Sequence, residues 1–300
     1  MRLVTRMILA AIAALPPLVA HPSQPQAVAV SQLATAPKID GDLSDWGTRA
    51  WTPVTIKPAL DKAERSQHGL DPADDRNVTG NLTVQIKAGV HQGRFYLALR
   101  YPDDREDRDY RGWEWRGDRY AEGKKLDDMA SVRFHMAGEF DRTMLSAKEY
   151  QVDVWLWSAA RSDRSSTADD FQHAISTRLQ DDAAEYTLPG GKTVYIKKTR
   201  DAGTPSIKPV PRPRENRGER IASFEIQQPS GSVADVAAKG VWKNGFWHLE
   251  FSRAMNTGNP DDRPFAAGQK IIGQIAVFNR GNAENKSISD PLVFDFSAIR

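Results

Sequence analysis

The stretch VWKNGFWHLEFSRAM, residues 241–255, carries the clearest fold signal of the chain. The Asn-Gly pair at 244–245 is the dipeptide that two-residue β-hairpin turns prefer, and an apolar run lies on each side of it. After the turn, Trp247 and Leu249 begin an alternation of apolar and polar residues, which is the period of a strand with one buried face. The stretch therefore predicts a β-hairpin in the wall of a sheet, and it leaves open whether the hairpin also lines a binding site.

Similar strand patterns recur along the chain, separated by turn-forming residues. They occupy residues 81–101, 127–138, 149–162, 269–281 and 287–299. The segment 149–162 is apolar on both faces, which indicates a central strand. The sequence shows no long amphipathic helix and no internal repeat. We therefore expect an all-β fold: an antiparallel β-sandwich, immunoglobulin-like or carbohydrate-binding-module-like, with long loop insertions at its ends.

Residues 1–29 have the pattern of a secretory signal peptide. Two arginines precede an apolar run at residues 7–14, and prolines and small residues follow. Cleavage is expected after Ala20 or after Ala29, with an uncleaved membrane anchor as the alternative. No other segment approaches the length that spans a bilayer, so we expect a periplasmic or otherwise exported protein without membrane insertion after signal removal.

The remaining residues, 30–300, are expected to form a single β-sandwich domain. Within it, the region around 162–231 is polar and rich in proline and glycine, and it is too long for a bare connection. We interpret it as a polar insertion, either functional or partly disordered.

The composition excludes several classes of cofactor and partner. The chain has no cysteine, so it forms no disulfide, attaches no haem covalently, and holds neither a thiolate zinc site nor an iron–sulfur cluster. The 41 basic and 39 acidic residues nearly balance, which argues against a nucleic-acid partner.

Motifs for catalysis and metal binding are also missing. We find no nucleophile elbow, no phosphate-binding loop and no dinucleotide fingerprint, so we expect an electron-transfer or binding protein without catalysis of its own. None of the six histidines pairs at metal-ligand spacing. Acidic pairs occur at residues 103–104, 127–128, 169–170, 181–182 and 261–262. They are typical of turns and loop ends, although calcium also uses carboxylates on loops, and the spacing is not that of an EF-hand.

The eight tryptophans allow two interpretations. Trp155 and Trp157 share one face of their predicted strand, while Trp113 and Trp115 lie in a charged, loop-like run. Core packing is one explanation for such residues, and an aromatic pocket for a flat apolar ligand is the other.

Five motifs together carry a resemblance to a known family. They are KIDGDLSDW at 38–46, GRFYLALRY at 93–101, DVWLWSAARS at 153–162, the long string at 229–262, and IAVFNRGNAENKSISDPLVFDF at 275–296. In this order they resemble the haem-binding domain of the gamma subunit of ethylbenzene dehydrogenase and of related cytochrome-type and dimethyl sulfoxide reductase-type proteins. The resemblance covers about residues 36–297. It implies a β-sandwich that holds a b-type haem noncovalently and exchanges electrons with a redox partner, such as a molybdenum oxidoreductase or a membrane cytochrome.

The resemblance also indicates where to look for iron ligands. The family holds its haem iron with a methionine and a lysine, and the matching positions here are Arg133 and Ala237. Side chains two residues apart on a strand share a face. We therefore expect His135 and Lys239 to replace the usual ligands, with Met129 as the alternative.

Other residues of the expected haem site follow from the same comparison. Arg133 suits a propionate because its charge is fixed, and Trp155 and Trp157 are expected against the cofactor. The alternative interpretation is a β-sandwich binding module without haem, which would take carbohydrate or another small ligand through exposed tryptophans such as Trp113 and Trp115.

Overall fold

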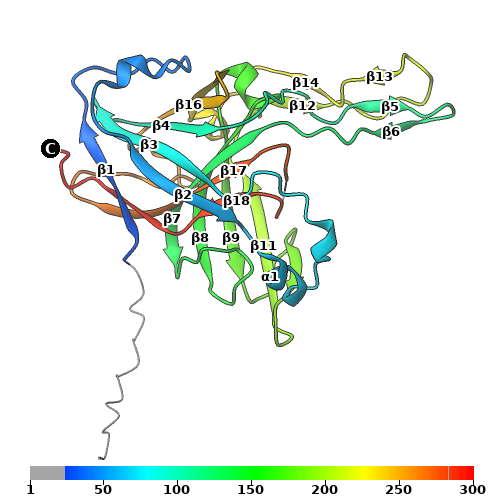
Figure 1. Cartoon of the computed structure of the whole chain (residues 1–300), viewed down its shortest axis with the longest axis horizontal. Coiled ribbons are helices and arrows are strands. Elements are labelled where there is room, and N and C mark those ends of the chain that lie inside the picture. Colours follow the sequence, from blue (N-terminus) through cyan, green and yellow to red (C-terminus); the bar gives the residue numbers. More distant parts are fainter. Residues whose placement is uncertain (1–23, 283) are drawn as a thin grey trace, which may run out of the picture.

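The fold of the chain is seen in a computed structural model that describes residues 24–282 and 284–300. Strands dominate, and nearly all pair antiparallel in two layers that cross each other, as the sequence predicts (Figure 1). The all-β sandwich is therefore confirmed. The exception to the antiparallel pattern is the first strand, which runs parallel to both of its neighbours.

The strands of the first half of the chain are β1 (Gln26–Gln32), β2 (Thr52–Pro58), β3 (Leu82–His91), β4 (Arg94–Pro102), β5 (Trp113–Trp115), β6 (Tyr120–Glu122), β7 (Met129–Gly138) and β8 (Tyr150–Ser158). Those of the second half are β9 (Asp169–Ser176), β10 (Ala184–Thr187), β11 (Thr193–Arg200), β12 (Ile207–Pro209), β13 (Arg220–Ile221), β14 (Phe224–Ile226), β15 (Ala237–Lys243), β16 (Phe246–Ala254), β17 (Lys270–Phe278), β18 (Ser287–Ser289) and β19 (Leu292–Asp295). Short helices lie between them: α1 (Lys62–Gln67), η1 (Leu43–Trp46), η2 (Pro72–Asp74), η3 (Ser162–Ser165) and η4 (Ser232–Ala234).

One continuous sheet supplies both layers of the sandwich. Its order is β10-β11-β9-β8-β7-β17-β18-β2-β3-β4-β16-β15, and β1 and β19 join the layers again through pairs with β3 and β17. The core lies between them. Phe95 of β4 contacts Phe134 of β7 and Trp155 of β8, with ring centroids 6.1 and 6.0 Å apart.

The hairpin at residues 237–254 forms as predicted. Asn244 and Gly245 both have positive φ, 54° and 79°, which is the conformation that an asparagine–glycine turn adopts at low cost. Trp247 and Leu249 are fully buried in the core, and the same strand face continues to a buried Arg253. The hairpin therefore anchors the sandwich wall and carries one charged residue into the interior.

The region expected as a polar insertion differs from the prediction. Residues 169–176 and 193–200 form β9 and β11, which extend the large sheet beside β8. These two strands are hard to predict from sequence because their composition is polar. Residues such as Asp169 and Asp170 are nevertheless buried, by partners from distant parts of the chain. Farther on, β12 to β14 join β5 and β6 in an arm that projects from the sandwich (Figure 1).

The first strand, β1, overlaps the end of the predicted signal peptide at residues 1–29. Residues 26–29 lie in β1 and pair with β19 from Leu292 onward, so cleavage after Ala29 would remove half of a paired strand. Ala20, the other predicted cleavage position, lies outside the described residues. Among the helices in the described part of the chain, none has both the length and the apolar character needed to cross a bilayer.

Candidate functional site

A pocket lies on the outer face of the strands whose other face forms the core. Its floor comes from β7, β8, β9, β11 and β17, and its cavity volume is about 300 Å³. The register explains why these side chains meet: Arg133, Val154 and Phe171 are paired across three adjacent strands and so point to one side. The volume is at the lower end of the range for small-molecule sites.

The wall of the pocket is mainly apolar. It includes Val154, Leu156, Phe171, Ile196, Phe278 and Ile288. Two segments outside the sheet complete it: the residues around α1, which supply Leu60 and Leu70, and the segment from Arg142 to Leu145. Such a wall excludes water and favours a ligand with a large apolar surface.

His173 is the most distinctive polar residue of the pocket. Burial, reinforced by the positive charges of Lys198, Arg133 and Lys286, lowers its pKa well below the ordinary value of 6.5. Its imidazole is therefore neutral at pH 7, which is the form that binds metals. Within the described residues the ring makes no hydrogen bond and only an aromatic contact with Phe171.

Two lysines share this part of the pocket. Lys198 is paired with His173 across β9 and β11, and burial lowers its pKa. Burial, followed by repulsion from Lys198 and Arg133, lowers the pKa of Lys286 to about 7. A substantial share of Lys286 is therefore a neutral amine near pH 7, and the two side chains bring nitrogen atoms and positive charge to the pocket.

Arg133 lines the pocket, as predicted, but its donors already have partners. It donates to Gln274 Oε1 at 2.7 Å, Tyr150 Oη at 3.1 Å, and the carbonyls of Asp141 and Arg142 at 2.6 and 2.8 Å. These bonds tie the segment after β7 over the pocket. Arg133 is thus a fixed part of the pocket wall, and its charge still contributes to the local field.

The other residues of the expected iron site are spread over different places. Met129 lines the pocket, and its sulfur accepts a hydrogen bond from Arg161 Nη2 at 2.8 Å. His135 lies on the same face at the edge, where its Nε2 is 2.9 Å from the Gly138 carbonyl. Lys239 is on β15, and its Nζ is 3.1 Å from both the carbonyl and a carboxylate oxygen of Asp163. His135 and Lys239 are therefore not brought together.

The tryptophans predicted against the cofactor lie on the opposite face of β8. Trp155 and Trp157 are fully buried in the core, where Trp157 meets Trp247 with centroids 4.9 Å apart. On the projecting arm, Trp113 donates to the carbonyl of Val210 at 2.9 Å, and Trp115 packs edge-on against a tyrosine.

Sequence reasoning did not single out His173, which shares a row of side chains with the predicted His135. His135, Val152 and His173 are paired in sequence across β7, β8 and β9, so the two histidines share a face about 10 Å apart. The local signal was the alternation of Phe171, His173 and Ile175 within a polar stretch. Without the strand pairing, nothing related this histidine to Arg133.

The motifs that carried the resemblance meet in buried hydrogen bonds. Glu250 of β16 accepts from the backbone N–H groups of Asp40 and Gly41 at 3.0 and 2.6 Å, and from Trp46 Nε1 at 2.6 Å. Burial raises the pKa of Glu250 to about 7. The KIDGDLSDW motif is thus the partner of the hairpin strand that defines the fold.

Comparison with known proteins agrees with this motif arrangement. A search of curated proteins gave no match. A model of the family described as ethylbenzene dehydrogenase matches residues 44–289, which includes every strand of the large sheet from β2 to β18. The chain belongs to the ethylbenzene dehydrogenase family.

Proposed function

We propose that the chain holds one b-type haem noncovalently in the pocket on the outer face of β7, β8, β9 and β11. In this role it would be an exported electron-transfer protein or subunit, with a molybdenum oxidoreductase or a membrane cytochrome as redox partner. The observation that carries the proposal is His173, a half-buried, neutral imidazole in an apolar pocket with no hydrogen bond inside the described chain. Family membership supports a relation to an ethylbenzene dehydrogenase subunit.

The residues of the pocket fit a haem. Apolar side chains such as Val154, Leu156 and Phe171 suit the macrocycle, and positive side chains at the pocket suit its carboxylates. His173 supplies a nitrogen ligand that needs no deprotonation at neutral pH. The absence of cysteine is consistent with a noncovalently held group. When bound, the haem would supply reversible one-electron chemistry.

The roles of the chain's own residues follow from their places. His173 would hold the haem iron, and Lys198, Lys286, Met144 or Met129 would offer a second donor from the pocket wall. The apolar wall keeps water from the iron, and Arg133 holds the covering segment in place through the carbonyls of Asp141 and Arg142. These features would set the reduction potential through ligation and burial.

A hemin titration of the folded, haem-free protein tests this proposal. We expect saturation at one hemin per chain, a Soret band of a six-coordinate haem, and a reversible spectral change on reduction. A near-infrared sulfur-to-iron band would identify a methionine, Met144 or Met129, as second ligand, and its absence would favour a lysine nitrogen. A folded protein that takes up no hemin, and that also carries none from haem-replete cells, would overturn the proposal.

A further inference from the structure

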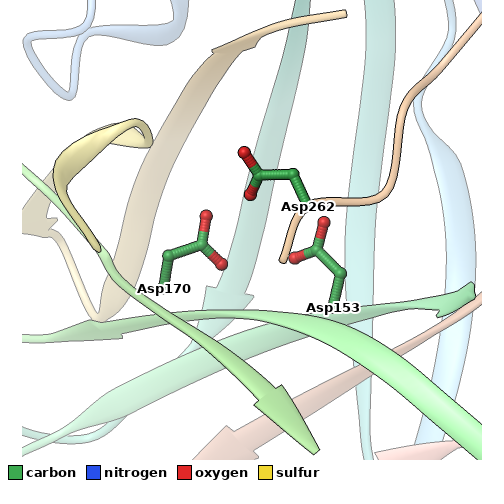
Figure 2. Close-up of side chains that lie close together, drawn as sticks. All are labelled: Asp153, Asp170 and Asp262. Atoms are coloured by element: carbon green, nitrogen blue, oxygen red, sulfur yellow. The ribbon is translucent and has the colours of Figure 1, made fainter. Parts of the chain in front are cut away.

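A cluster of carboxylates lies on the core side of the same strands, centred on Arg253. The Arg253 guanidinium is fully buried, and its Nη1 is 2.8 Å from Asp153, 3.3 Å from Asp170 and 2.7 Å from Asp262. Figure 2 shows these three aspartates converging from β8, β9 and the loop after β16. In this first triad the arginine occupies the position that a cation would otherwise take.

A second triad shares Asp262 with the first. Carboxylate oxygens of Asp201, Asp261 and Asp262 all lie within 4.8 Å of one another. Asp261 has donors in Ser232 Oγ at 2.9 Å and the Ala202 N–H at 3.3 Å. Asp201 is different: it is only 5% exposed, and neither of its carboxylate oxygens has a hydrogen-bond donor among the described residues.

The local charge does not balance. Six carboxylates influence one another here: those of the second triad and those of Asp153, Asp170 and Asp235. In the described chain, the cation that forms ion pairs within this group is Arg253. One oxygen of Asp153 is also buried without a donor. Burial, followed by repulsion from these neighbours, raises the pKa of Asp201 to about 8. Buried charge of this kind needs a proton or a cation.

We propose that Asp201, Asp261 and Asp262 form a calcium site. All three donors are oxygens, which hard divalent cations prefer. Calcium–oxygen distances of about 2.3–2.6 Å place opposite ligands about 5 Å apart, whereas magnesium would require about 4 Å. Separations below 4.8 Å are compatible with either cation, and calcium is favoured because it accepts several protein oxygens in flexible geometry, whereas magnesium usually keeps several waters.

The site would join two parts of the fold. Asp201 directly follows β11, and Asp261 and Asp262 lie in the loop after β16. Calcium would fasten the end of β11, whose Lys198 lines the pocket on the other face. None of these observations involves the haem pocket, so the calcium site stands or falls independently of haem.

The test uses the full chain after treatment with a chelator and titration calorimetry with calcium chloride. We expect one calcium per chain with a Kd below about 1 mM, a rise in Tm, and much weaker binding of magnesium. The variant Asp201→Asn should weaken calcium binding by at least about 10–100-fold. Loss of a residue that only hydrogen-bonds to a metal ligand already lowers metal affinity by about that factor, and Asp201 would be a direct ligand. Asp118→Asn, an exposed change on the projecting arm, is the matched control and should bind as the wild type does.

The apo proteins give a second readout. At pH 9 and without calcium, Asp201 is ionised, so Asp201→Asn should melt at a higher temperature than the wild type because it relieves repulsion among buried carboxylates. With calcium the order should reverse. Absence of calcium binding by the folded wild type, or equal binding by Asp201→Asn and Asp118→Asn, would overturn the site. Should Asp201→Asn fail to fold, Asp261→Asn replaces it with the same expectation.

Discussion

Strands β8 and β9 present two very different environments on their two faces. Toward the core, Asp153 and Asp170 are fully buried charges fixed by the guanidinium of Arg253. Toward the outside, Val154 and His173 line an apolar pocket in which the imidazole makes no hydrogen bond within the described chain. The strand period of two places these faces one residue apart.

The two faces differ in how their polar groups are satisfied. The carboxylates on the core side bond within the chain, whereas the imidazole on the pocket side does not. Each carboxylate that meets Arg253 has an intramolecular partner, as a buried charge requires. His173 is neutral at pH 7, and its ring makes no hydrogen bond within the described chain. The comparison therefore predicts that changes on the core side affect stability, whereas changes on the pocket side affect binding.

The largest effect is expected from Arg253→Met. The change leaves three buried carboxylates without their cation, and breaking such a pair costs about 3–5 kcal/mol. Urea denaturation followed by tryptophan fluorescence measures it. As a control, Arg105→Met removes an exposed ion pair and should leave the urea midpoint almost unchanged. Similar losses for both variants would contradict the account of the core side.

Glu250 predicts a specific pH dependence. Its pKa is about 7 in the folded protein and near 4.5 when unfolded, so the folded state binds more protons between these values. Its contribution to stability is present in full below about pH 4.5 and is lost as the pH rises through about 7, by up to roughly 3 kcal/mol.

Glu250→Gln removes this titration while it keeps acceptor and donor groups at the site. The difference in unfolding free energy between variant and wild type, measured from pH 4.5 to 8, should therefore change in favour of the variant as the pH rises. A difference that is constant with pH would show that Glu250 is ionised throughout.

Adjacent residues of β7 allow a matched comparison of the two faces. Ala130 is fully buried in the core, and Ser131 lines the pocket. Ala130→Leu overpacks the core and should cost about 1–3 kcal/mol. Ser131→Leu enters the cavity and should change stability by less than about 1 kcal/mol, while it weakens hemin binding at least tenfold. Loss of hemin binding with Ala130→Leu alone would reverse the assignment of the faces.

The smallest effect is expected from Lys239→Met. Lys239 is predicted from sequence as an iron ligand, yet it lies on β15 outside the pocket wall, where its amine bonds to Asp163 of η3. The pair is partly exposed, so its loss should cost less than about 1 kcal/mol. The absorption spectrum of a hemin complex should be identical to that of the wild type. A changed spectrum would restore Lys239 as a ligand.

The sequence predicts the fold well because its strongest signals are local. The Asn244–Gly245 turn and the alternation that follows it depend on neighbouring residues alone, and both appear in the structure. The pocket depends on pairing between distant strands. The residues next to His135 in the sequence do not show that Val152 lies between His135 and His173 in the sheet. Likewise, the residues around Asp170 do not show that its carboxylate accepts a hydrogen bond from Arg253.

The most direct test of the central claim compares the two histidines that share one row of the sheet. Hemin is added to His173→Ala and to His135→Ala, and the absorption spectra of the oxidised and reduced complexes are recorded. The account predicts that His173→Ala loses hemin or shifts to a five-coordinate spectrum, while His135→Ala keeps the wild-type spectrum. An unchanged spectrum for His173→Ala, with loss of the band in His135→Ala, would contradict it.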